Sequence, residues 1–195
     1  MAKWQALNYE KSIPDIIQKT FEIYCPRGTD IFDKPPSTHR FDAPVIYTTT
    51  TVGAFKSAAV TVKGDWTYQY DQGGLCLYID LQDGTRKWIK TGIEFVDGVP
   101  RVSVVTKDRW ADWSLTPLLD AEAKHARVRI EIHEDKSLWV YLVDGAGKKH
   151  PIREVTWWEE FSQDTKVNVG PAAAKPSTDG GDLVVTFEGF SLVTR

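Results

Sequence analysis

The sequence predicts an all-β protein, an antiparallel β-sandwich with few short helices. Short runs rich in β-branched and aromatic residues follow one another at roughly ten-residue spacing. Turn-forming residues separate these runs, and helical periodicity is nearly absent. With 195 residues and 42% hydrophobic content, the chain can bury a large core as one domain over residues 1–195.

The first clear strand is Phe21–Cys25, which alternates in polarity and is ended by Pro26–Asp30. The preceding segment Ser12–Lys19 fits either a short helical turn, with Pro14 near its start, or an irregular lead-in. Ile31-Phe32 is expected in a loop that continues through Pro35-Pro36. The next β-prone runs are Ala43–Thr51 and Ala54–Val62.

The clearest turn is Asp97-Gly98, the strongest short-range signal of a two-residue type I′ hairpin. This turn sets the register of its two strands, and alternation then separates a core face from an outer face. The core face pairs Ile93 with Val102, Thr91 with Val104 and Ile89 with Thr106. The outer face pairs Glu94 with Arg101, Gly92 with Ser103, Lys90 with Val105 and Trp88 with Lys107.

The strand before this hairpin repeats the alternation and is joined to it by the turn residues Gln82–Gly84. Its core side chains are Leu75, Leu77 and Ile79, and its outer side chains are Cys76, Tyr78 and Asp80. If Asp80 lies opposite Arg86, then Tyr78 lies opposite Trp88 and Gln72 opposite Glu94. A slip of two residues would preserve the same faces.

A second hairpin spans Arg127–Leu142, and a loop of Glu134–Lys136 keeps like faces together. It pairs Ile132 with Leu138 and Ile130 with Val140, which places Glu131 beside Trp139 and Arg129 beside Tyr141. Between the hairpins, Leu115–His125 is the other place where a short helix is plausible. The tail is read as strands at Lys149–Val155 and Lys166–Val169, a loop over Gly170–Gly181 and a closing strand at Leu183–Val193.

Composition argues against several classes of partner and cofactor. A formal net charge of −3 without a basic tract disfavours nucleic acid and anionic membranes. The N-terminus lacks the apolar segment of a secretory signal, so we expect a cytoplasmic protein with Cys25 and Cys76 reduced. His39, His125, His133 and His150 have no metal-binding spacing, and no phosphate or dinucleotide loop is present, so we expect neither a metal nor a cofactor.

The outer face of the central strands predicts a carbohydrate site. Sugar C–H faces stack on aromatic rings, while hydroxyl groups need fixed donors and acceptors. The alternative is a solvated face with ordinary cross-strand ion pairs such as Glu94 with Arg101. The residues expected to bind the ligand are Gln72, Tyr78, Trp88, Lys90, Glu94, Arg101 and Ser103, joined by Arg129, Glu131, Trp139 and Tyr141 of the second hairpin.

Catalytic residues are not identified by the sequence. A glycosidase needs two carboxylates flanking the scissile bond. Glu94 and Asp97 have opposite parity, and Asp97 belongs to the turn. Glu94 could meet Glu131 or Asp112 in space, although Asp112, between Trp110 and Trp113, is better explained as structural.

Several motifs in order resemble a known family. They are the segments YDQGGLCLYID, WIKTGIEFVDG, SVVT and ADWS within Trp66–Ser114, together with Thr29–Phe32 upstream. In combination they resemble the fungal and bacterial regulation-of-enolase family, whose domain is of unknown function and is similar to the concanavalin A-like lectin/glucanase superfamily. The resemblance implies a jelly-roll sandwich with a concave carbohydrate-binding face, and it supplies no catalytic residues.

These observations lead to three functional hypotheses. The first is a cytoplasmic protein that binds a carbohydrate or a small sugar metabolite and is linked to the regulation of carbohydrate metabolism. The second is a glycoside hydrolase or lyase that uses carboxylates of the concave face. The third is a protein-interaction regulator of a glycolytic enzyme such as enolase.

Overall fold

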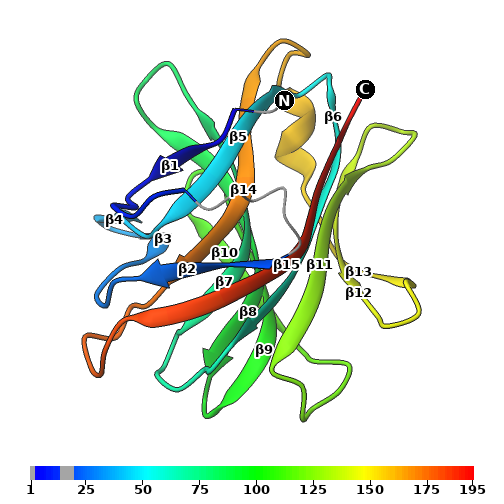
Figure 1. The fold of residues 1–195 in the computed structure, drawn as a ribbon. Helices are drawn as coiled ribbons and strands as arrows, with labels where there is room; N and C mark the ends of the chain where they lie inside the picture. Colours follow the sequence, from blue (N-terminus) through cyan, green and yellow to red (C-terminus); the bar gives the residue numbers. More distant parts are fainter. Residues whose placement is uncertain (1–2, 14–19) are drawn as a thin grey trace.

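The computed structural model describes residues 3–13 and 20–195, which form two packed antiparallel sheets (Figure 1). The seven-stranded sheet has the order β1-β5-β14-β7-β8-β9-β10, and the six-stranded sheet has the order β13-β12-β11-β6-β15-β2. A further hairpin, β3-β4, forms its own two-stranded sheet. The fold class predicted from the sequence, an antiparallel β-sandwich, is confirmed.

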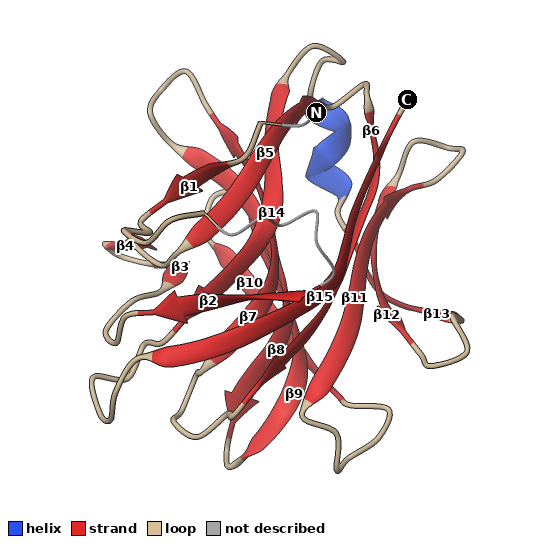
Figure 2. Cartoon of the chain, viewed as in Figure 1, coloured by secondary structure: helices blue, strands red, loops and turns tan. Residues whose placement is uncertain are grey.

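The strands occupy most of the described chain, and the helix drawn in Figure 2 is the short 3-10 helix η1, Thr156–Glu160. None of the helices in the described ranges is long and apolar enough to cross a membrane. The strand bounds are β1 Gln5–Leu7, β2 Thr20–Cys25, β3 Ile31–Lys34, β4 Thr38–Phe41, β5 Val45–Thr51, β6 Phe55–Gly64, β7 Gln72–Asp80, β8 Arg86–Val96, β9 Val99–Lys107, β10 Ala111–Pro117, β11 His125–Ile132, β12 Leu138–Val143, β13 Lys149–Glu154, β14 Lys166–Ala174 and β15 Leu183–Thr194.

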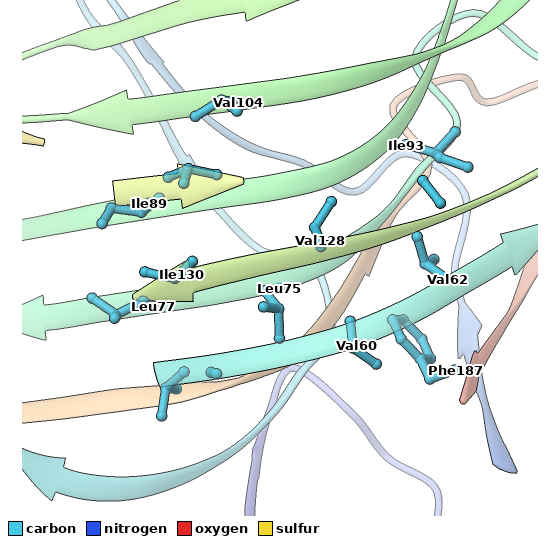
Figure 3. Packing of buried hydrophobic residues seen from close by; sticks show 14 of the residues in the cluster. Val60, Val62, Leu75, Leu77, Ile89, Ile93, Val104, Val128, Ile130 and Phe187 are labelled. Carbon is cyan, nitrogen blue, oxygen red and sulfur yellow. The ribbon is translucent and has the colours of Figure 1, made fainter. Parts of the chain in front are cut away.

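The main core lies between the two sheets. Alternate residues of each strand point inward, so side chains of β6 and β11 face those of β7, β8 and β9 (Figure 3). The predicted core residues Leu75, Leu77, Ile79, Ile89, Ile93 and Val102 all belong to this buried cluster. The two cysteines, Cys25 and Cys76, are buried and free.

The register set by Asp97-Gly98 is confirmed. Both residues have positive φ, 54° and 81°, as a type I′ turn requires. Val96 pairs with Val99, Glu94 with Arg101 and Trp88 with Lys107.

The registers of the other two predicted strand pairs are also confirmed. In β7 and β8, Asp80 pairs with Arg86, Tyr78 with Trp88 and Gln72 with Glu94. In β11 and β12, Ile132 pairs with Leu138, Glu131 with Trp139 and Arg129 with Tyr141.

Two segments predicted as loops are strands in the structure. The loop expected around Ile31-Phe32 is the hairpin β3-β4. The expected loop over Gly170–Gly181 begins later, because β14 continues to Ala174 between β5 and β7. The backbones of β14 and β5 approach closely at Gly170, where a Cβ would lie 2.0 Å from the Ile46 carbonyl oxygen. This close approach requires a residue without a side chain.

The helix considered at Leu115–His125 is absent, because its first residues extend β10 and pair with β9 as far as Pro117. A proline that ends a strand also removes a donor that a helix interior would need. The segment Ser12–Lys19 lies largely outside the described residues.

Candidate functional site

The hairpin β3-β4 covers the centre of the outer face of the seven-stranded sheet. Phe41 packs edge-on against Tyr78 and Trp88, with ring centroids 5.4 and 6.5 Å apart. Tyr78 and Trp88 are therefore buried, with 2% and 0% of their surface exposed. The expectation that these two rings form an open surface is wrong, because strand parity assigns a face but does not show what packs upon it.

A pocket of about 260 Å³ remains open beside this hairpin. Two of the predicted residues, Lys90 and Glu94, line it. The pocket also contains residues that the sequence did not indicate as ligand-binding: Asp30, Phe32, Lys34, Tyr70, Val105 and Trp113. We call this the Glu94 pocket.

Glu94 is the central acidic group of the pocket, and its side chain is held in one orientation. Ser103 Oγ donates a hydrogen bond of 2.7 Å to Glu94 Oε2, and Trp113 Nε1 donates one of 3.1 Å to Ser103 Oγ. Only 6% of Glu94 is exposed. Burial raises the pKa of this carboxyl group, outweighing the opposing effects of the Lys90 charge and the Ser103 hydrogen bond.

A second carboxylate, Asp30, enters the pocket from the loop before β3. Lys90 Nζ lies 3.8 Å from Asp30 Oδ1 and donates a hydrogen bond of 2.9 Å to the Ile31 carbonyl oxygen. The Asp30 charge also contributes to raising the pKa of Glu94. The pocket thus combines the carboxylates of Asp30 and Glu94 with the ammonium groups of Lys90 and Lys34.

Gln72 connects Asp30 to the Tyr70 loop. Its Nε2 donates to Asp30 Oδ1 at 3.4 Å and to the Tyr70 carbonyl oxygen at 3.1 Å. Its Oε1 is buried and has no hydrogen-bond partner among the described residues. An unsatisfied buried acceptor of this kind is uncommon. Gln72 lies behind the pocket and is not part of its lining.

Near Glu94, Gly74 and Gly92 pair directly across β7 and β8. A Cβ on Gly74 would lie 1.9 Å from the Thr91 carbonyl oxygen, and one on Gly92 would lie 2.0 Å from the Gly73 carbonyl oxygen. Only glycine permits this close approach of the two backbones.

Two aromatic rings form the exposed wall of the pocket. Tyr70 and Trp113 meet edge to face with centroids 5.9 Å apart, and 40% and 36% of their surfaces are exposed. Tyr70 has a positive φ of 67°. This conformation is unfavourable for a tyrosine, so contacts around the loop must hold it.

A buried ion pair supplies these contacts. Lys175 Nζ lies 3.3 Å from Asp71 Oδ1 and 3.8 Å from the centroid of the Tyr68 ring. Asp71 Oδ2 also accepts hydrogen bonds from the backbone amides of Thr67 and Tyr68, at 3.1 and 2.9 Å. The pair therefore fixes the turn that presents Tyr70 to the pocket.

Four predicted site residues lie elsewhere. Arg129, Glu131, Trp139 and Tyr141 belong to β11 and β12 of the six-stranded sheet, so they do not share a face with Glu94. The hairpin register is local and does not show which sheet the hairpin joins. The expected grouping of the two hairpins on one face is therefore wrong.

These residues form a network of their own. Glu131 accepts hydrogen bonds from Arg129 and, at 2.9 Å, from Lys149 Nζ. Burial alone would raise the pKa of Glu131, but these bonds outweigh it and hold the pKa below its usual range. Trp139 Nε1 donates to Ser137 Oγ at 2.9 Å. Partners within the chain thus already occupy these polar groups.

Three further outcomes concern the predicted charges. Arg101 pairs with Glu94 in the backbone register, but no ion pair joins the two side chains within the described chain. Asp112 has a structural contact, since Arg153 Nη2 lies 2.8 Å from its Oδ2. No three His, Cys, Asp or Glu side chains of the described ranges lie close enough together to hold a metal ion.

Comparison with known proteins places the chain among proteins of uncertain function. A family model described as "Protein of unknown function (DUF1349)" matches residues 7–194. An uncharacterized protein of Emericella nidulans is 43% identical over 189 residues, covering 96% of this chain and 94% of that protein. "Regulation of enolase protein 1" of Saccharomyces cerevisiae is 32% identical over 140 residues, covering 72% of this chain and 65% of that protein.

Solved structures show the same fold. A functionally unknown protein from Saccharomyces cerevisiae has a TM-score of 0.78 at 25% identity, covering 98% of this chain and 96% of its own. A GH43 protein from Bacillus licheniformis has a TM-score of 0.63 at 14% identity, covering 90% of this chain and 33% of its own. An alginate lyase from Pseudomonas aeruginosa has a TM-score of 0.57 at 11% identity, covering 89% and 82%.

Proposed function

The chain belongs to the DUF1349 family of proteins of unknown function, and from this starting point we propose that its Glu94 pocket binds a carbohydrate or a small sugar metabolite. The observation that supports this proposal most is Glu94 itself, a buried carboxyl group held by Ser103 beside two exposed aromatic rings. A general link to carbohydrates is consistent with the glycosidase-like and lyase-like folds of the structural relatives.

The chemistry of the pocket suits a sugar. The Tyr70 and Trp113 rings can stack on C–H faces, while Glu94, Asp30 and Lys90 can bind hydroxyl groups. These polar groups are oriented before a ligand arrives, which lowers the entropy lost on binding.

The size of the pocket limits the ligand. Its volume is about 260 Å³, and the hairpin β3-β4 covers the neighbouring Tyr78 and Trp88. A long polysaccharide would need that covered surface. We therefore expect a monosaccharide, a short oligosaccharide end or a sugar-derived metabolite.

Calorimetric titration with mono- and oligosaccharides tests the proposal. Trp113→Ala and Glu94→Gln should each weaken binding by about tenfold or more, as expected for loss of a stacking ring or a charged hydrogen-bond acceptor. Glu131→Gln on the other sheet is the matched control and should bind like the unmodified protein. Absence of binding across the panel, or equal binding by all variants, would contradict the proposal.

A hydrolase or lyase is the second candidate, and the pairing of Glu94 with Asp30 in one pocket favours it. Burial raises the pKa of Glu94, which suits a general acid, while Asp30 could act as the base. Release of reducing ends or unsaturated sugars from a glycan panel would support turnover, provided that Glu94→Gln and Asp30→Asn each abolish it. Equal product from these variants would exclude this pocket as the source.

The name of the yeast relative supports a third candidate, a cytoplasmic regulator that contacts a glycolytic enzyme. Co-sedimentation with purified enolase tests this role directly. Failure to co-sediment at micromolar concentrations of both proteins would count against it.

A further inference from the structure

A second pocket opens on the other side of the hairpin β3-β4. It has a volume of about 710 Å³ and is lined by the hairpin together with the turns that join β7 to β8 and β9 to β10. It shares no lining residue with the Glu94 pocket. Because His39 is its most distinctive group, we call it the His39 pocket.

His39 is fixed in orientation although most of it faces solvent. Its Nδ1 lies 3.0 Å from Asp33 Oδ2, and its side chain is 61% exposed while that of Asp33 is 6% exposed. The imidazole also stacks on Trp110, with centroids 5.1 Å apart and planes inclined by 22°. An ionised carboxylate can only accept a hydrogen bond, so Nδ1 carries the proton and Nε2 remains for a ligand.

Attachment of the hairpin to the sheet does not require the contact between His39 and Asp33. Lys107 Nζ lies 2.9 Å from the same Asp33 oxygen, and both side chains are buried. This ion pair already joins β3 to β9 without His39. The carboxylate behind His39 instead resembles the partner that orients histidine ligands and bases in other proteins.

A third arginine, Arg109, lies in the same pocket. Arg40 and Arg86 also line it, but they are paired with Asp42 and Asp80. The Arg109 side chain forms no ion pair or hydrogen bond with any residue that the structure describes. A guanidinium group of this kind is suited to a phosphate or carboxylate group.

We propose that the His39 pocket binds a small hydroxylated anion, a polyol or sugar that carries a phosphate or carboxylate group. Nε2 of His39 accepts a hydrogen bond from a hydroxyl group of the ligand, and the Arg109 guanidinium group binds the phosphate or carboxylate group. Asp33 is a positioning residue, since it acts through His39. This site is independent of the proposed function of the Glu94 pocket.

Calorimetric titration with glucose 6-phosphate, gluconate, glucose and inorganic phosphate tests the proposal. We expect glucose 6-phosphate or gluconate to bind more tightly than glucose or inorganic phosphate, and the preferred acid identifies the anionic group. His39→Asn and Arg109→Gln should each weaken this binding by about tenfold. His125→Asn, an exposed histidine of the other sheet, is the matched control.

Glu94→Gln separates the two sites. If the His39 pocket is the binding site, this variant binds the sugar acid as the unmodified protein does, whatever happens to neutral sugars. The proposal is overturned if neither sugar acid binds, or if His39→Asn and Arg109→Gln, folded as judged by their thermal transitions, bind as tightly as the unmodified protein.

Discussion

Replacement of Lys175 by Met is expected to destabilise the protein strongly, because it leaves the Asp71 carboxylate buried without its counter-ion. The two side chains are 2% and 1% exposed, and their charged atoms lie 3.3 Å apart. Removal of one partner of a buried pair typically costs about 3–5 kcal/mol. Asp71 keeps two backbone amide donors, so we expect the lower end of this range, about 3 kcal/mol.

A matched pair is available as a control. Lys124 Nζ and Asp65 Oδ1 also lie 3.3 Å apart, but their side chains are 71% and 95% exposed. Lys124→Met should therefore change stability by about 1 kcal/mol or less. Any large difference between the two variants then reflects burial, since the distance between the charges is the same.

Urea unfolding followed by tryptophan fluorescence measures both variants. Lys175→Met should shift the midpoint with little change in the slope of free energy against urea concentration. The double variant Asp71→Asn/Lys175→Met should recover part of the loss, because no unpaired charge remains. A loss below about 1 kcal/mol in Lys175→Met would refute the reasoning, since it would equal that of an exposed pair.

Three further predictions concern the site and the thiols. Burial raises the folded-state pKa of Glu94, so the stability that its protonated form contributes is present below the unfolded pKa and is lost as pH rises through the raised pKa. Glu94→Gln should therefore raise the melting temperature more at pH 7.5 than at pH 4. An equal change of melting temperature at both pH values would contradict this prediction. Trp88→Ala should lower the free energy of unfolding in urea by about 3–5 kcal/mol, whereas Trp113→Ala should lower it by about 1 kcal/mol or less. Similar losses for the two variants would contradict the difference in burial between the two rings. Burial raises the pKa of Cys25 and Cys76 to about 12 each, so a thiol reagent at pH 8 should label them only after unfolding; rapid labelling of the native protein would disprove it.

The sequence predicted the local geometry of the sheets well. The Asp97-Gly98 turn allows few backbone conformations, so it determined the pairing of β8 with β9 and hence the face of Glu94, Lys90 and Ser103. The β11-β12 register followed similarly from keeping apolar residues on one face. Both predictions depend on contacts between residues close in the chain.

Contacts between segments far apart in the chain could not be predicted from these local patterns. Alternation places Trp88 on the outer face but does not reveal that Phe41 covers it. Asp30 lies in the same pocket as Glu94 although its loop is distant in the sequence, and Tyr70 joins the pocket from the turn before β7. Trp113 could have been placed with the β9-β10 register, which sets it opposite Val105, the partner of Lys90.

The hairpin β3-β4 has its own small apolar cluster, with Ile31, Tyr78 and Trp88 among its members, separate from the main cluster between the sheets. Changes in its length or composition would thus leave the central packing of the sandwich intact. Insertions or deletions between residues 31 and 41 could resize both neighbouring pockets during evolution or engineering. The sandwich would then act as a constant frame, and the hairpin as the part whose length can vary.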